Sequence, residues 1–295
     1  MDELVKKNRR QCISALISCA IVVIFVFLAV TVNLLKIPAW KFDNVGVRTF
    51  CLFTVNSNIF AAICAFAVIP YAIDGLRKKE YILPNWVVIL MLTGTTAVTL
   101  TFLVTLFLLA PINGFQEMFS GVLFFLHGVC PILTILAFCL FVTSCKITVK
   151  QSFFSLIPVT IYAIIYFIMV MIVTEENGGW NDIYGFATRV PFWVPTILFL
   201  PITFGITTVI RLWHNHSFVR RRKNESQIFI DHFEGKKAEE IIFEMGKARA
   251  KIQPTGDVVL PMLVIKQIAY FTDSELSIDE ASKLYLEGYL CAIKK

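Results

Sequence analysis

Residues 119–136 read Phe-Ser-Gly-Val-Leu-Phe-Phe-Leu-His-Gly-Val-Cys-Pro-Ile-Leu-Thr-Ile-Leu, an apolar stretch with His127 near its centre and Pro131 four residues later. In an α-helix, Pro131 removes the hydrogen bond to the carbonyl of residue 127 and kinks the helix there. A histidine side chain in the middle of a membrane-spanning helix is expected to have a hydrogen-bond partner or a functional role. We expect His127 to be the only Asp, Glu, Lys, Arg or His in the interior of any apolar run, away from its ends.

Further apolar runs of similar length surround this one. The chain has 295 residues, of which 57% are hydrophobic and 16% charged, whereas a typical soluble domain carries about 25% charged residues. A membrane-spanning helix needs about 20 apolar residues. The sequence therefore predicts an all-α polytopic membrane protein with a six-helix transmembrane bundle. The predicted spans cover residues 12–35, 50–72, 86–110, 120–144, 152–173 and 192–212.

Basic residues near the span ends predict the orientation, because cytoplasmic loops carry the excess of Lys and Arg. One side of the predicted bundle, which includes both termini, collects fourteen Lys and Arg, and the other side has four. We expect a multi-pass protein of the cell membrane with cytoplasmic N- and C-termini. The positive charge follows the membrane ends, so it indicates topology and no nucleic-acid binding.

The composition changes after a basic cluster at residues 220–223. Residues 1–223 hold 18 Lys and Arg against 9 Asp and Glu, and residues 224–295 hold 9 against 12. We predict a membrane domain over 1–223 and a small cytoplasmic helical tail over 224–295. The pattern Ser277-x-x-Glu280 predicts a capping box at the start of the last helix.

Apolar side chains of that last helix, Ile278, Ala281, Leu284 and Tyr285, are predicted to face inward. The tail carries no recognisable catalytic pattern, and a protein partner for it stays open. Elsewhere, the eight cysteines lie mostly within or at the ends of apolar runs, with no Cys-x-x-Cys pair. No metal and no other cofactor is expected, because His, Cys and carboxylates form no cluster with ligand spacing.

A polar group interrupts the second predicted span, where residues 54–58 read Thr-Val-Asn-Ser-Asn. At 1.5 Å per residue, Thr54 and His127 lie roughly 6 and 10 Å below the outer ends of their spans. They can therefore share a site if the two helices are neighbours. Thr54, Ser57 and Asn58 share one helix face, and Asn56 points elsewhere.

These residue types fit acyl transfer. A neutral histidine takes a proton from a threonine hydroxyl, and Ser57 and Asn58 can orient it or donate to a developing oxyanion. We take Thr54 and His127 as candidate catalytic residues and Asn56, Ser57 and Asn58 as candidate binding residues. A structural role fits the same side chains, because polar groups in membrane helices often bond helix to helix. Both interpretations stay open.

The third predicted span is rich in threonine. We expect its hydroxyls to bond to the carbonyl four residues earlier or to support close helix contacts, with a substrate path as the alternative. The external loop 174–191 is glycine- and aromatic-rich, which fits a lid over the outer end of the bundle or a plain connector.

Phe-Thr54-Val-Asn-Ser-Asn58 in the second span and Leu-His127-Gly-Val-Cys-Pro131 in the fourth resemble the androgen-induced-gene-like family of multi-span membrane proteins. The resemblance covers about residues 12–212. It implies an intramembrane threonine hydrolase of fatty acid esters of hydroxy fatty acids, in which Thr54 matches the nucleophile and His127 the catalytic histidine. The family's tryptophan/tyrosine-proline-rich stretch appears here only as Trp180-Asn-Asp-Ile-Tyr184-Gly-Phe, and the tail has no counterpart.

The leading hypothesis is therefore an intramembrane lipid-ester hydrolase that uses a Thr/His dyad and is entered from the outer leaflet. Its ligand is a membrane lipid or a lipid-like small molecule. The alternatives are a non-enzymatic transporter or lipid-binding protein, and a membrane anchor for a partner-binding tail. No Asp or Glu lies inside a predicted span, which counts against ion or proton coupling.

Overall fold

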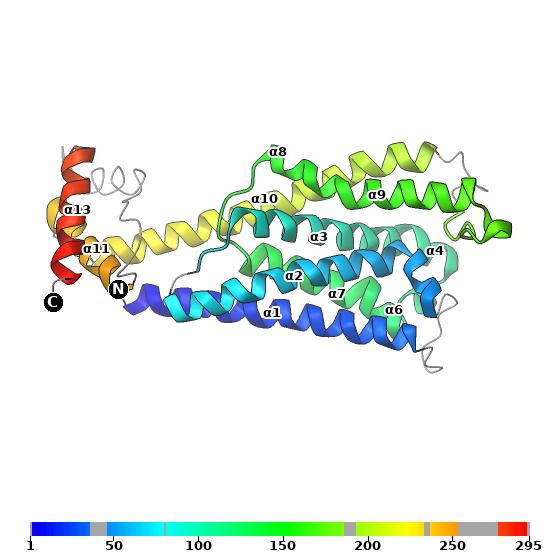
Figure 1. Cartoon of the computed structure of the whole chain (residues 1–295), viewed down its shortest axis with the longest axis horizontal. Coiled ribbons are helices and arrows are strands. Elements are labelled where there is room, and N and C mark those ends of the chain that lie inside the picture. Colours follow the sequence, from blue (N-terminus) through cyan, green and yellow to red (C-terminus); the bar gives the residue numbers. More distant parts are fainter. Residues whose placement is uncertain are drawn as a thin grey trace. The chain divides into compact units, whose positions relative to one another are not determined.

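The protein is helical throughout the part that the computed structural model describes, which is residues 2–35, 46–79, 81–185, 193–232, 237–252 and 277–293 (Figure 1). No strand occurs among these residues. The elements are α1 (Asp2–Leu34), η1 (Gly46–Cys51), α2 (Phe53–Lys78), α3 (Asn85–Val104), η2 (Thr105–Leu109), α4 (Ala110–Asn113), α5 (Phe115–Met118), α6 (Gly121–Phe124), η3 (Phe125–Val129), α7 (Cys130–Leu136), η4 (Ala137–Phe141), α8 (Val149–Ser152), η5 (Phe153–Ser155), α9 (Leu156–Phe167), η6 (Ile168–Ile172), η7 (Glu175–Asn177), α10 (Trp193–His232), α11 (Ala238–Ile252) and α13 (Ile278–Ile293).

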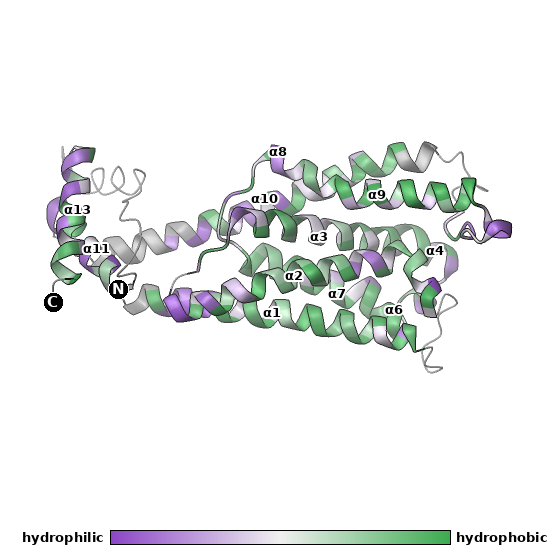
Figure 2. Ribbon diagram, in the orientation of Figure 1, coloured by the Kyte–Doolittle hydropathy of each residue, from purple (hydrophilic) through white to green (hydrophobic). Residues whose placement is uncertain are grey.

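Six helical stretches in the described residues are long and apolar enough to cross a membrane, as the sequence predicts. They run over Val5–Leu34, Phe53–Lys78, Asn85–Asn113, Gly121–Phe141, Val149–Ile172 and Ile197–Arg221. Figure 2 shows hydrophobic residues over most of their length. The all-α class and the six apolar helices are thus confirmed.

The chain divides into two compact units. The larger one contains residues 9–76 and 81–221, and the smaller one contains the described residues among 1–8, 77–80 and 222–295. All six apolar stretches belong wholly or mainly to the larger unit. The helices of this unit run side by side along a common direction (Figure 1).

Helix α3 forms the centre of the larger unit, because every residue from Met91 to Thr101 is buried. Its threonine hydroxyls bond back to the carbonyl four residues earlier, as in Thr95 to Met91 and Thr99 to Thr95, both at 2.7 Å. The predicted back-bonding is confirmed there. A glycine, Gly94, permits close contact with α2, since a Cβ at this position would lie 2.8 Å from Cys64 Sγ.

The last apolar helix is longer than predicted, and this corrects one expectation. Helix α10 continues past residue 212 to His232, and its apolar stretch reaches Arg221. His127 is therefore not the only buried histidine of the apolar helices. His214 is fully buried, its Nε2 lies 3.0 Å from the Val142 carbonyl oxygen, and its ring stacks on Phe138.

In the smaller unit, α11 packs against α13. The predicted capping box is confirmed, because Ser277 Oγ accepts from the Glu280 amide while the Glu280 carboxylate accepts from the Ser277 amide. Of the residues predicted to face inward, Ala281 and Tyr285 are buried. Ile278 is exposed, contrary to prediction, because it is the first residue of α13. Residues 253–276 of the predicted tail lie outside the described residues.

Candidate functional site

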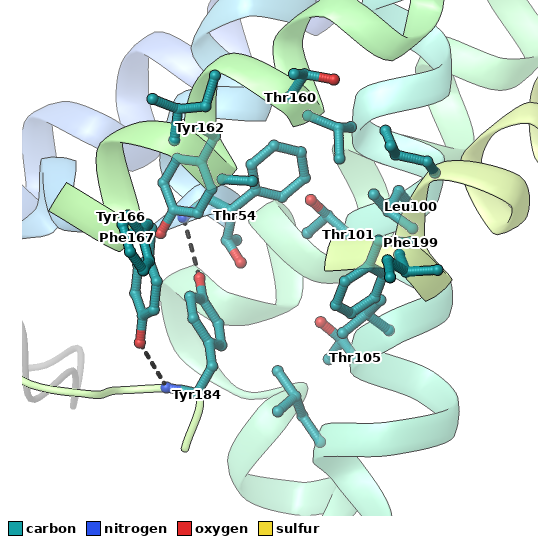
Figure 3. A pocket seen from close by; sticks show the side chains of 18 residues that line it. Thr54, Leu100, Thr101, Thr105, Thr160, Tyr162, Tyr166, Phe167, Tyr184 and Phe199 are labelled. Atoms are coloured by element: carbon teal, nitrogen blue, oxygen red, sulfur yellow. Dashed lines mark hydrogen bonds between the residues drawn. The ribbon is translucent and has the colours of Figure 1, made fainter. Parts of the chain in front are cut away.

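A cavity of about 430 Å³ lies in the larger unit, between α2, α3 with η2, α9 and α10. Figure 3 shows the side chains that line it, among them Thr54, Thr101 and Thr105. None of the described residues that line the cavity is charged, and its polar side chains are threonines and tyrosines only. A cavity of this size and chemistry suits the apolar part of a small ligand.

Thr54 lies at the start of α2 and is the one sequence-predicted site residue on the cavity wall. Its side chain is 8% exposed. Its carbonyl oxygen accepts hydrogen bonds from Ser57 Oγ at 3.0 Å and from Asn58 Nδ2 at 2.7 Å. Two side chains of the next turn thus hold the backbone of Thr54, as expected for residues that share a helix face.

Ser57 and Asn58 also connect α2 to its neighbours. Ser57 Oγ lies 2.8 Å from Thr101 Oγ1 on α3, and Asn58 Nδ2 donates to the Leu126 carbonyl at 2.9 Å. Asn56 instead donates from Nδ2 to the Phe50 carbonyl at 2.8 Å and is partly exposed. Its side chain points away from the shared face, as the helical spacing predicts.

The Leu126 carbonyl needs this bond because of Pro131. Residues 125–129 form the π-helical turn η3, in which the Cys130 amide donates to the Phe125 carbonyl. In that i+5 register the next pair is residue 131 with residue 126, and proline has no N–H to donate. The carbonyl that lacks a donor in this register is therefore that of Leu126, whereas in an α-helical register it would be that of residue 127.

Asn58 thereby brings the second and fourth apolar helices together at the height of both candidate catalytic residues. The carbonyl oxygens of Thr54 and Leu126 each lie within 3 Å of the same Asn58 nitrogen. His127 directly follows Leu126 along the chain. The fully buried Oδ1 of Asn58 has no hydrogen-bond partner among the described residues.

His127 is buried, and its ring faces its own helix–loop segment. Nδ1 lies 2.8 Å from the Met118 carbonyl oxygen, and the edge of the ring packs against Phe119. Because a carbonyl oxygen only accepts, the proton of a neutral imidazole sits on Nδ1, which leaves the lone pair on Nε2. Among the described residues His127 does not line the cavity, and no hydrogen bond joins it to Thr54.

Tyr166 and Tyr184 are two of the tyrosines that line the cavity, and of these the sequence pointed only to Tyr184, as part of its loop. The Tyr184 hydroxyl accepts a hydrogen bond from the Phe53 amide at 3.0 Å, and the Tyr184 amide donates to the Tyr166 hydroxyl at 3.3 Å (Figure 3). The Tyr166 hydroxyl in turn donates to Asp182 Oδ1 at 2.9 Å. Burial raises the pKa of Tyr184, so its hydroxyl is protonated at neutral pH.

The loop that carries Tyr184 was expected to be a lid or a connector, and its described part reaches the cavity wall. Residues 186–191 of the predicted loop lie outside the described residues. The amide of Phe53 is one of the unpaired donors at the start of a helix, so the Tyr184 bond fixes both the loop and the turn that holds Thr54. The only signal for this contact in the sequence is the concentration of aromatic residues in the loop.

Comparisons with protein-family models, with curated proteins and with solved structures found no match to this chain.

Proposed function

We propose that this chain is a multi-pass membrane protein that binds a lipid ester in the cavity and hydrolyses it, with Thr54 as the nucleophile and His127 as the general base. The observation that carries the proposal is the position of Thr54, a buried hydroxyl-bearing residue on the wall of an uncharged cavity. The proposal also rests on the resemblance of residues 54–58 and 126–131 to a family of intramembrane threonine hydrolases. The excess of basic residues on one side of the apolar helices supports cytoplasmic termini as part of the proposal.

The chemistry follows from the roles of the two side chains. Thr54 Oγ1 attacks the ester carbonyl carbon while its proton passes to His127 Nε2, and the alcohol leaves with that proton as the C–O bond breaks. Water then hydrolyses the acyl-threonine by the same path in reverse. The Met118 carbonyl keeps Nε2 unprotonated and ready to act as base, which is the orienting role that a third group plays beside a catalytic histidine.

The two side chains must approach each other when the ligand is bound. Catalytic hydrogen bonds are often long or absent in ligand-free proteins and shorten in the complex with substrate. Asn58 supports such an approach, because it fixes the backbones of Thr54 and Leu126 at the same height.

A fluorophosphonate probe applied to the purified protein in detergent tests the proposal. We expect covalent labelling of the wild type, loss of labelling in Thr54→Ala and His127→Ala, and retention in Thr54→Ser. Thr105→Ala is the matched control, because Thr105 is a buried threonine of the same cavity. Labelling that persists in a folded Thr54→Ala variant contradicts the proposal, as does a folded wild type that is not labelled.

One observation favours a second candidate, non-covalent binding or transport of a lipid-like ligand. His127 engages Met118 and Phe119 and does not line the cavity in the described structure. This candidate predicts that a lipid analogue binds or crosses the membrane equally well with Thr54→Ala, without covalent labelling.

A further inference from the structure

The residues of α9 that line the cavity fall into two groups, one buried and one exposed at the surface. Val159 and Tyr166 line the cavity and are buried, whereas Thr160, Ile164 and Phe167 line it and are exposed. The three exposed residues follow the spacing i, i+4, i+7 and form one stripe along the helix. The cavity therefore reaches the surface of the larger unit along this edge of α9.

Helix α10 supplies the opposite edge of this opening. Ile197 lines the cavity and is 62% exposed, and Ile164 of α9 lines it and is 55% exposed. The two helices lie side by side (Figure 1). The ring centroids of Phe153, just before α9, and Phe204 of α10 are 4.8 Å apart. We call the opening edged by Thr160, Ile164, Phe167 and Ile197 the lateral opening.

The described part of the external loop closes another side of the cavity. Tyr184 lines the cavity and is tied to α2 through Phe53 and to α9 through Tyr166. A ligand that comes from the aqueous end must break these bonds, whereas the lateral opening is bordered by apolar side chains and one threonine. The route with the fewest polar contacts to disrupt is the sideways one.

The surroundings of the lateral opening indicate what enters. The apolar stretch Val149–Ile172 is the least buried of the six, so most of its apolar surface has no cover from the described chain. In a membrane, lipid chains cover such a surface. A charged group inside this uncharged cavity would lose its hydration and find no partner. A cavity that opens toward lipid therefore favours uncharged groups of molecules that are dissolved in the membrane.

We propose that a membrane-dissolved lipid ester enters the cavity sideways, between α9 and α10, with one acyl chain passing through the lateral opening. The inference rests on the proposed function, of which it specifies the substrate class and the route. The substrate is a long-chain ester, the uncharged part of which occupies the cavity, with its acyl chain along α3 and α9 and its ester group facing Thr54. Water-soluble short-chain esters are excluded as preferred ligands.

Photolabelling in lipid nanodiscs tests this route without requiring turnover. The probe is an alkyl ester of palmitic acid with a diazirine in its acyl chain, and mass spectrometry locates the insertion sites. In the wild type we expect labels on inner-wall residues such as Leu100 and Val104. Ile164→Trp is expected to lower this labelling roughly tenfold, because an overpacked opening excludes the chain. Ile197→Trp, on the other edge, is expected to do the same.

Ile161→Trp is the matched control, because Ile161 is also an exposed isoleucine of α9 but does not line the cavity. It should label like the wild type, and size-exclusion profiles identify any variant that fails to fold. Inner-wall labelling that is equal in all folded variants overturns the lateral route, even if Thr54-dependent hydrolysis persists. Labelling that falls with the two edge variants but not with Thr54→Ala supports the route, and it does so whether or not the wild type hydrolyses esters.

Discussion

Replacement of Asn58 by leucine keeps the volume of the side chain and removes both of its hydrogen bonds, to the carbonyls of Thr54 and Leu126. Each bond contributes about 1 kcal/mol to stability, and the buried carbonyl of Leu126 that loses its donor costs a further ~1–3 kcal/mol. The leucine also removes the buried Oδ1 that has no described partner, which returns about 1 kcal/mol or more. We expect a net loss of about 2–4 kcal/mol.

The origin of this loss can be isolated with Pro131→Ala. An alanine at 131 supplies the N–H that the Leu126 carbonyl lacks in the register of η3. In this background Asn58→Leu should therefore cost ~1 kcal/mol less than in the wild type, which is within the usual range for hydrogen bonds between membrane helices. For a domain of this size, the difference corresponds to about 2–4 °C in Tm.

The buried cysteines of the chain provide the assay. Cys19, Cys64, Cys130 and Cys139 are buried and free, so a maleimide fluorophore reports their exposure on heating in detergent. Asn56→Leu is the control, because Asn56 bonds only to the Phe50 carbonyl at the surface and should show no coupling to Pro131→Ala. An equal decrease in Tm from Asn58→Leu in both backgrounds would refute the link between Asn58 and the proline-freed carbonyl.

Two further predictions concern packing and pH. Gly94→Ala should destabilise the larger unit, since its Cβ would lie 2.8 Å from Cys64 Sγ. We expect an overpacking cost of about 1–3 kcal/mol, from which the ~1 kcal/mol that alanine gains over glycine in a helix is subtracted. Gly205→Ala is the control, because a Cβ there meets open space on α10, and thermal melts should show that it stabilises the protein. Hydrogen bonds from Ser277 lower the pKa of Glu280, so this carboxylate stabilises the start of α13 above its unfolded pKa and the effect is lost as pH falls. Ser277→Ala should therefore speed amide exchange of α13 at neutral pH and remove this pH dependence; a variant that exchanges like the wild type contradicts it.

The six apolar helices were predictable because hydropathy is a local property and each run is long enough to span a membrane. The end of the last helix was not. The basic residues at 220–223 mark a membrane end in the sequence, yet α10 continues through them, because backbone hydrogen bonding does not stop at an interface. His214 escaped notice for the same reason, as it lies just beyond the predicted end at residue 212.

At the candidate site, helical spacing correctly placed Ser57 and Asn58 on the face of Thr54, and Asn56 off it. The spacing gives no information on which neighbour each side chain meets. The π-helical register that leaves the Leu126 carbonyl without a donor was not predictable, because a π-helical turn depends on tertiary packing. The threonine-rich third span was the one pattern that pointed to a ligand path, and two of its threonines, Thr101 and Thr105, line the cavity. The rest of the lining left no pattern in the sequence, since its residues come from four helices and a loop.

The contacts of Asn58 also remove the opposition between a structural and a functional reading of the polar group at 54–58. A side chain that only holds two helices together and one that positions a Thr/His dyad would make the same two bonds here, because Thr54 and the residue before His127 are the groups that are held. Measurements of stability and of labelling separate the two roles.

In the double variant Asn58→Leu/Pro131→Ala, the Leu126 carbonyl regains a donor, so part of the lost stability returns. The backbones of Thr54 and Leu126 are still no longer tied to one nitrogen. Fluorophosphonate labelling that stays low in this variant at a temperature where it is folded would assign Asn58 a positioning role, and labelling that recovers together with Tm would leave it a purely structural one.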